Sequence, residues 1–280
     1  MPNRLTFLLI PALVVCAVLG ASCERLPDAT LRQTDLRAST AVRGDSLFIT
    51  FTNPAPIPTR IEVSSKESDV DERVRTRLVL EPSSETVVAL DVAGLDSAKV
   101  RSNLSFSFTF GSLDTPVRPV PLAWPFPRGR SYEVIQGYEG SFSHTSAYSR
   151  YALDFNLAEG DTISAADDGW VVGVIEGYDV GGDDPKYRPY ANYITVYHPH
   201  SGVVTQYVHL LPGGSFVAVG DSVGRGQPLG RAGLTGFTNI QHLHFNVLVA
   251  DSTEGMVSIP VTFENGTAGE SLRQRDRVGH

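Results

Sequence analysis

The sequence contains very little cysteine: two residues in 280, Cys16 and Cys23, both near the N-terminus. A disulfide framework and a cysteine-rich zinc module are therefore excluded. A surplus of basic residues is also missing, because 23 lysines and arginines face 31 aspartates and glutamates, for a formal net charge of −8. A chain of this sign is repelled by phosphate backbones, so we expect no nucleic-acid partner.

Long hydrophobic runs are missing as well, apart from one near the N-terminus, Leu5 to Gly20. This run is shorter than the roughly 20 residues of a membrane-spanning helix, and Pro11 interrupts it. It follows the cationic Arg4 and leads into small residues. These features predict a secretory signal peptide over residues 1–22. We therefore expect an exported protein of the cell envelope or periplasm.

Cys23 ends the sequence Gly-Ala-Ser-Cys, which resembles a bacterial lipobox. In a lipobox the cysteine is lipidated and becomes the mature N-terminus, although the usual leucine is displaced here by one position, to Leu19. We expect lipidation at Cys23, with contact to a membrane only through that anchor. The alternative is ordinary cleavage after a small residue, which leaves a secreted protein with a free Cys23.

Short runs of β-branched and aromatic residues, separated by turn residues, fill the next part of the chain. They are Ser46 to Phe51, Thr59 to Val63, Arg77 to Leu80, Thr86 to Val92 and Leu104 to Phe110. Such runs are typical of antiparallel strands with one solvated face. We predict an Ig-like β-sandwich over residues 23–115. It contains no histidine, and we interpret it as a spacer or binding module.

A proline-rich stretch at residues 116–128 follows and predicts an extended linker. A second β-domain is expected over residues 129–263, with a C-terminal tail at 264–280. Its predicted strands are Trp170 to Ile175, Tyr193 to Tyr197, Val203 to Leu210, Phe216 to Val219 and Phe245 to Val249. No convincing amphipathic helix occurs there. The predicted fold class is therefore all-β.

Polar residues capable of binding a metal gather in this second domain. His242 and His244 lead into a predicted strand, where residues two apart project from the same face. His209 ends another strand, and His144 precedes Asp154, a carboxylate in an otherwise apolar strand. A cation shared with imidazoles would offset the cost of burying that carboxylate. Taken alone, each His or Asp has an ordinary structural interpretation.

A second His-x-His sequence, His198-Pro199-His200, is interpreted differently. Its proline removes a ladder donor and Ser201-Gly202 follows, so we expect this pair in solvent at a hairpin turn.

The ordered set His144, Asp154, Tyr-Val-His209-Leu and His242-Leu-His244-Phe resembles the signature of the lysostaphin-type (LytM-like) zinc metallopeptidases, which cleave peptides in bacterial cell walls. The resemblance covers about residues 129–263 and implies a LytM-like antiparallel β-sheet core. It implies zinc ligands at His144, Asp154 and His244. It also implies two catalytic histidines, His209 and His242, whose separate roles stay open.

Three N/O ligands leave a tetrahedral zinc one open position for water, as hydrolysis requires. We therefore expect a zinc metalloendopeptidase whose partner is a peptidoglycan peptide, with the cleaved bond undetermined. One alternative is a catalytically inactive LytM-like regulator or wall-binding module. Another is a lipoyl- or biotinyl-type carrier, suggested by Val219 to Val223 and Gly226 to Gly230. The carrier lacks the modifiable lysine at a central turn.

Overall fold

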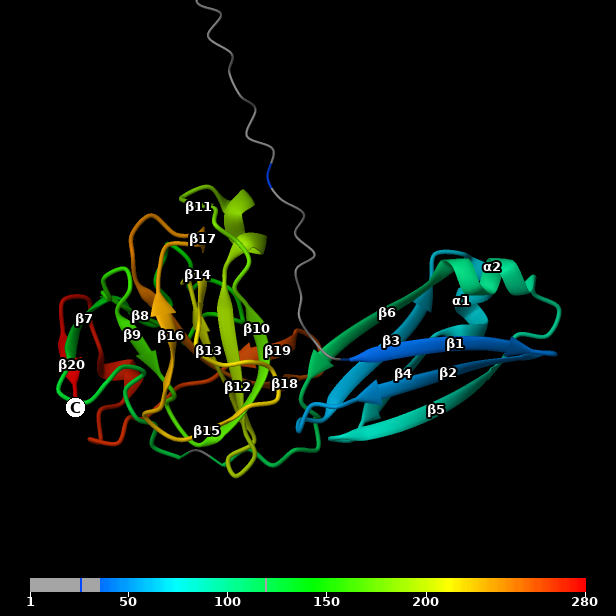
Figure 1. Cartoon of the computed structure of the whole chain (residues 1–280), viewed down its shortest axis with the longest axis horizontal. Helices are drawn as coiled ribbons and strands as arrows, with labels where there is room; N and C mark the ends of the chain where they lie inside the picture. Colours follow the sequence, from blue (N-terminus) through cyan, green and yellow to red (C-terminus); the bar gives the residue numbers. More distant parts are fainter. Residues whose placement is uncertain (1–25, 27–35, 119) are drawn as a thin grey trace, which may run out of the picture.

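A computed structural model describes residues 26, 36–118 and 120–280. The described chain forms two β-rich lobes that lie side by side (Figure 1). The all-β prediction is confirmed. The predicted signal peptide at 1–22 and the proposed lipidation site Cys23 lie outside the described residues. Among the residues that are described, no helix is both long and apolar enough to cross a membrane.

The N-terminal lobe consists of two antiparallel sheets around one core. One sheet has the order β1-β2-β5, with β1 at Arg37–Arg43, β2 at Ser46–Asn53 and β5 at Ser84–Asp91. The other has the order β4-β3-β6, with β3 at Thr59–Ser65, β4 at Thr76–Leu80 and β6 at Leu104–Phe110. Alternate residues of β2 are buried, as the sequence predicted for strands with one solvated face.

Two short helices in this lobe were not predicted, α1 at Ser68–Val74 and α2 at Ser97–Asn103. In α1 only Val70 and Val74 are buried, and seven residues are too few for a helical period to stand out. The start of α2 carries a local signal, because the Asp96 carboxylate accepts a hydrogen bond from the Ala98 amide. Both helices pack apolar residues into the core of the sandwich.

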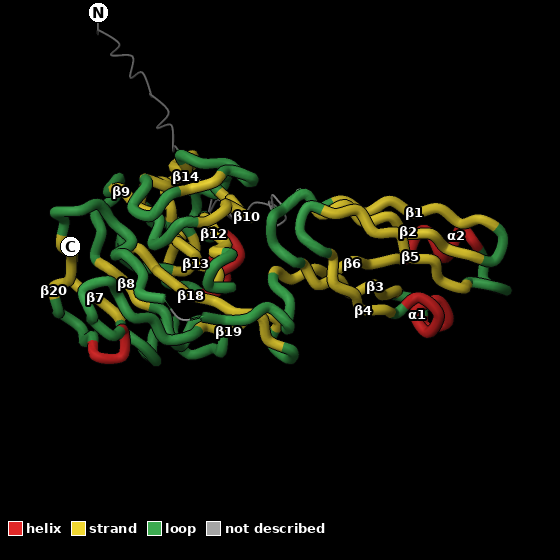
Figure 2. The backbone as a smooth tube through the Cα atoms, turned by 90° about the horizontal axis from the view of Figure 1, so that it is seen from below, coloured by secondary structure: helices red, strands yellow, loops and turns green. Residues whose placement is uncertain are grey.

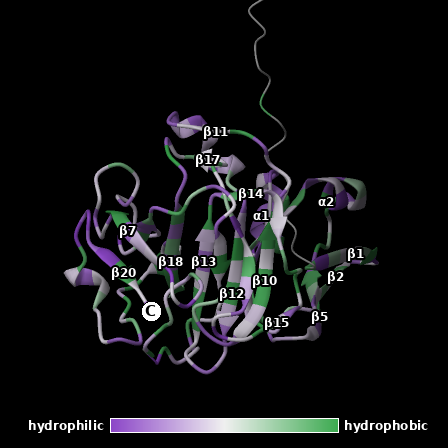
Figure 3. Ribbon diagram, turned by 60° about the vertical axis from the view of Figure 1, so that its left-hand side comes forward, coloured by the Kyte–Doolittle hydropathy of each residue, from purple (hydrophilic) through white to green (hydrophobic). Residues whose placement is uncertain are grey.

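The second lobe is built on one large sheet with the strand order β15-β10-β12-β13-β18-β8-β7-β20, and β19 pairs with β18. Its strands are β7 (Ser131–Gln136), β8 (Leu153–Phe155), β10 (Gly169–Ile175), β12 (Tyr193–His198), β13 (Val203–Val208), β15 (Ser222–Val223), β18 (Leu243–Asp251), β19 (Gly255–Ser258) and β20 (Arg277–Gly279). Figure 3 shows hydrophobic positions along β10, β12 and β13.

Smaller elements cover this sheet. A second sheet has the order β14-β16-β9, with β9 at Thr162–Ser164, β14 at Leu210–Ser215 and β16 at Pro228–Ala232. A parallel pair joins β11 (Gly181–Gly182) to β17 (Gly236–Phe237). Two 3-10 helices, η1 (Pro185–Tyr190) and η2 (Gly269–Ser271), complete the described lobe.

The register of β18 separates the core from the polar face. Leu243, Phe245 and Val247 belong to the buried core, so the intervening His244 and Asn246 project from the opposite face of the sheet. His244 pairs directly with Asp154 on β8 and with Val208 on β13. His244 therefore projects from the same face of the sheet as Asp154.

Two strand predictions need correction. The predicted strand from Val203 to Leu210 breaks at His209, which has a φ of 68° and separates β13 from β14. The predicted strand at Phe216 to Val219 is absent from the described structure, and β14 instead covers the preceding residues, 210–215. Pro212 and the two glycines after it resemble a turn in sequence, but β14 pairs irregularly with β16 and tolerates them.

Part of the predicted linker at 116–128 belongs to the core of the second lobe. Leu122, Trp124 and Phe126 are buried there, and the Trp124 ring stacks on Phe263 with centroids 3.7 Å apart. The predicted tail at 264–280 also joins this lobe, because β20 pairs with β7. Chain segments on both sides of the predicted domain at 129–263 therefore complete its packing.

The two lobes contact each other at one face of the large sheet. Ile57 and Phe110 from the sandwich pack with Val204 and Leu248 from the large sheet. The Arg60 guanidinium donates hydrogen bonds to backbone carbonyls of Gly111, Asp251 and Gly255. Figure 2 shows the sandwich as an extension beside β18 and β19. The polar and apolar contacts hold the sandwich directly against the second lobe.

The prediction that both histidines of His198-Pro199-His200 lie in solvent is wrong for His198. The hairpin turn between β12 and β13 is present and His200 is exposed, but His198 is fully buried. Its Nδ1 donates to the Asp168 carbonyl at 2.8 Å, and its Nε2 lies 2.8 Å from the Thr205 hydroxyl. The imidazole connects the turn to the loop before β10, a contact that the local sequence does not show.

Acid should destabilise the folded chain through His198. Burial lowers the pKa of His198 from its ordinary value of 6.5, so the unfolded chain binds the proton more tightly. The neutral His198 side chain contributes its full share of the stability above pH 6.5. This contribution is lost as the pH falls through the lower pKa that His198 has in the folded state. We expect the urea midpoint of chelator-treated protein to fall between about pH 7.5 and about pH 5.5. His198→Asn should reduce that fall, whereas an equal fall in both proteins would contradict the assignment.

Candidate metal centre

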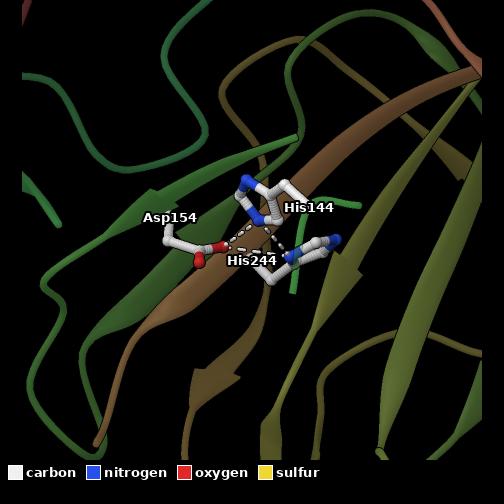
Figure 4. A group of neighbouring side chains, drawn as sticks. All are labelled: His144, Asp154 and His244. Atoms are coloured by element: carbon white, nitrogen blue, oxygen red, sulfur yellow. Dashed lines mark hydrogen bonds and ion pairs between the residues drawn. The ribbon is translucent and has the colours of Figure 1, made fainter. Parts of the chain in front are cut away.

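Three potential metal ligands converge from distant parts of the chain (Figure 4). His144 lies in the turns before β8, Asp154 in β8, and His244 in the neighbouring strand β18. The His144 Nε2 lies 3.2 Å from Asp154 Oδ1 and 3.2 Å from His244 Nδ1. The His244 Nδ1 lies 2.9 Å from the same Asp154 oxygen. The structure thus brings together all three residues that the sequence predicted as ligands.

The spacing of these donor atoms fits a tetrahedral zinc ion. Ligand bonds of about 2.0–2.1 Å in a tetrahedron place neighbouring donor atoms roughly 3.3 Å apart. The three observed separations, 2.9, 3.2 and 3.2 Å, are close to that edge length. Two imidazoles and one carboxylate are also ligands that zinc accepts in hydrolytic sites. The donor set and its geometry therefore suit the metal that the sequence predicted.

Neighbouring groups orient two of these ligands. The His144 Nδ1 donates to the Gly137 carbonyl at 2.7 Å, which leaves the Nε2 lone pair directed at the cluster. The Gln136 amide donates to Asp154 Oδ2 at 3.0 Å. A Cβ on Gly140 would lie 2.3 Å from Gln136 Cγ, so this glycine makes room for the glutamine. Sequence reasoning missed Gln136, because only the pairing of β7 with β8 brings it to Asp154.

Replacing Gln136 by leucine should weaken metal binding. The substitution keeps a side chain of similar size but removes the hydrogen bond that fixes Asp154, and losses of such supporting contacts typically cost 10- to 100-fold in metal affinity or activity. We expect a rise in zinc dissociation constant of about that size, measured by competition with a chromogenic chelator. Asn265→Leu, a substitution at an exposed turn position, is the control. Unchanged zinc affinity in Gln136→Leu would show that Asp154 needs no such support.

His209 and His242 lie next to the three ligands. Their ring centroids are 4.6 Å apart, and the His209 and His244 centroids are 6.1 Å apart. The His209 Nδ1 lies 2.6 Å from the Thr235 carbonyl, and the His242 Nδ1 lies 3.0 Å from the Ile240 carbonyl. A carbonyl only accepts, so both Nδ1 atoms carry hydrogen, and in the neutral form of either ring the lone pair is on Nε2. A neutral imidazole held in this way accepts a proton at Nε2.

The electrostatics of the cluster keep Asp154 ionised. Burial favours its neutral form, but the attraction of His242 and His144 and hydrogen bonds from His144 and His244 outweigh it and hold its pKa well below the ordinary value. Burial lowers the pKa of His209 well below its ordinary value, and the charges of His242 and His244 act in the same direction. A neutral His209 beside an ionised Asp154 is the state in which the site can bind a cation and accept a proton.

An aromatic contact joins the loops around this cluster. Phe142, two residues before His144, stacks on Phe237 with centroids 4.8 Å apart. The Arg188 guanidinium from η1 lies 5.0 Å from the Phe237 ring. These contacts connect the segment that carries His144 to η1 and β17. Three segments that are distant in sequence therefore contact one another next to His144.

Comparison with known proteins gives a family match over the second lobe. Residues 148–255 match the family model described as peptidase family M23. The catalytic domain of lysostaphin from Staphylococcus simulans is 25% identical over 46% of this chain and 87% of its own, with a TM-score of 0.33. A zinc-containing peptidase from Vibrio cholerae is 19% identical over 76% of this chain and 55% of its own, with a TM-score of 0.36.

Coverage of the longer structures is partial. The chain covers about half the length of two of them, 47% of complete lysostaphin and 55% of the Vibrio cholerae peptidase. A search of the curated proteins gave no significant match.

Proposed function

Residues 148–255 belong to peptidase family M23, and from this premise we propose that the protein is a zinc metalloendopeptidase that hydrolyses peptide bonds in peptidoglycan. The observation that carries the proposal is the convergence of His144, Asp154 and His244 at tetrahedral spacing, with two further imidazoles beside them. We assign the first three residues to zinc binding. His209 and His242 are the proposed catalytic residues.

In this proposal each side chain has a defined task. Zinc, when bound, supplies a Lewis acid that polarises the amide carbonyl and makes water acidic. The Nε2 atom of His209 or His242 accepts the proton of the attacking water, because its Nδ1 hydrogen is bound to a carbonyl. The second imidazole, when protonated, donates a hydrogen bond from its Nε2 atom to the oxyanion that develops on the carbonyl oxygen. Burial of both rings limits access of bulk water.

The proposal extends to the location of the protein. The signal-like N-terminus and the lipobox-like sequence at Cys23 support export to the cell envelope and a lipid anchor. Peptidoglycan is an extracytoplasmic polymer, so export agrees with the proposed substrate. Intact mass measurement of the mature N-terminus tests this part, and an unmodified residue there would remove the anchor.

The direct test of activity uses purified sacculi. Incubation with the zinc-loaded protein should release soluble muropeptides, and mass spectrometry should identify the bond that is cut from the new termini. Added chelator should stop the release, and zinc should restore it. A regulator without catalysis, the alternative function, predicts binding to sacculi without new termini.

A further inference from the structure

A pocket of about 360 Å³ lies between the two lobes. Its floor contains Gly173 from β10, Thr195 from β12 and Gln206 from β13. One wall comes from the sandwich, where β6 contributes Phe108 and Phe110. The pocket is therefore composite, and neither lobe forms it alone.

This interlobe pocket lies on the same face of the large sheet as the proposed zinc ligands. His244 pairs with Val208, and Asn246 pairs with Gln206, so Gln206 and His244 project in the same direction. Two residues along a strand correspond to about 7 Å. Tyr148 lies over this part of the sheet, because its carbonyl accepts a hydrogen bond from the Asn246 amide and its hydroxyl donates to Gln206. A peptide bound at the zinc ligands would therefore reach the pocket by passing beside Tyr148.

The lining of the pocket favours a positively charged group. Glu254, in the turn between β18 and β19, is the single charged residue among the described residues that line it. Phe108 and Phe110 add aromatic rings, whose faces attract ammonium groups. At the floor, the Gln206 amide donates to the Thr195 hydroxyl, and its oxygen accepts from the Tyr148 hydroxyl. A carboxylate and aromatic rings that line the same pocket are complementary to an ammonium ion at the end of an alkyl chain.

We propose that the interlobe pocket binds a substrate side chain that ends in an ammonium group, with the sandwich supplying one wall of a specificity subsite. The inference rests on the proposed peptidase function, because it places the bound residue near the reacting bond. It also gives the N-terminal lobe a function beyond that of a spacer. Glu254 acts in binding and takes no part in proton transfer.

Gly173 provides a second, independent way to test the pocket. A Cβ at this position would lie 3.5 Å from Thr195 Cβ and 3.9 Å from Phe110 Cε2, which are ordinary contact distances. Its φ lies outside the left-handed region, so a larger residue causes no backbone strain of that kind. Gly173→Val therefore adds methyl groups to the floor of the pocket, and its Cβ meets only ordinary contacts.

The experiment compares binding to native sacculi with binding to sacculi whose free amines have been acetylated. It uses the His244→Ala variant, which should be unable to cut the wall during sedimentation. We expect about three- to tenfold tighter binding to native sacculi. Adding Glu254→Gln should remove this preference. Adding Glu159→Gln, which removes an exposed charge outside the pocket, should leave the preference intact.

Several results would overturn the proposal. Equal binding to native and acetylated sacculi would do so, as would an equal effect of Glu159→Gln and Glu254→Gln, which would indicate attraction by net charge. Gly173→Val should weaken binding to native sacculi about three- to tenfold at an unchanged melting temperature, and unchanged binding would also contradict the pocket. Failure of the peptidase proposal has a separate readout, because it appears as a lack of muropeptide release by the wild-type protein.

Discussion

Replacing His244 by alanine should remove zinc from the protein and abolish muropeptide release. His244 supplies one of three donor atoms that lie 2.9–3.2 Å apart, and the remaining two ligands cannot hold the metal in the same geometry. Zinc contributes several kcal/mol to the stabilisation of the transition state, so the rate should fall by about a thousandfold or more. Metal analysis of the purified variant and fragment release from sacculi measure the two effects together.

A matched control separates loss of a ligand from loss of an imidazole. His200 is exposed and lies 2.8 Å from Asp167, away from the cluster, so His200→Ala should keep both zinc and activity. Asp154→Asn provides a second test of the ligand set, because it keeps the shape of the side chain and removes its charge. Wild-type zinc content in both His244→Ala and Asp154→Asn would refute the proposed metal centre.

Replacing His209 or His242 by alanine should leave zinc bound but slow hydrolysis by about 10²- to 10⁴-fold, the usual contribution of a general acid or base. Neither residue belongs to the three-atom cluster, and each Nδ1 is bound to a backbone carbonyl outside it. The expected result is thus a normal metal content with a low rate. Zinc analysis and initial rates on the same preparations measure it.

The pH dependence of the two variants should distinguish the roles of His209 and His242. A variant that lacks the general base should lose the acidic limb of the pH–rate profile, whereas a variant that lacks only an oxyanion donor should keep it. If either alanine variant loses its zinc, that residue is a ligand and the assignment of catalytic and ligating residues is wrong.

The sequence predicted much of the chemistry because side chains with distinctive chemistry carry it. The alternation of His242, Leu243 and His244 predicted the two imidazoles on a common face. In the structure β18 begins at Leu243, just after His242, and His144, Asp154 and His244 come together. The groups that orient these side chains were harder to predict. His209 is oriented by the carbonyl of Thr235, and a backbone carbonyl is present in every residue, so no residue type indicates this role.

Local sequence patterns also did not predict the packing between segments that are distant in sequence. The prolines around Trp124 indicate a linker, yet its ring stacks on Phe263, 139 positions later. The burial of His198 depends in the same way on Asp168, which belongs to another loop. Contacts of this kind follow from the topology of the sheets, which strand patterns alone do not specify.

The positive φ of His209, 68°, means that selection for stability and selection for activity act in opposite directions at this position. Non-glycine residues in this region of backbone space are strained by about 1–3 kcal/mol, and glycine relieves such strain. A library sorted only for heat resistance would therefore enrich glycine at position 209 and discard a proposed catalytic imidazole. Any attempt to make a more robust form of this protein must hold residue 209 constant and seek stability elsewhere, for example in the sandwich.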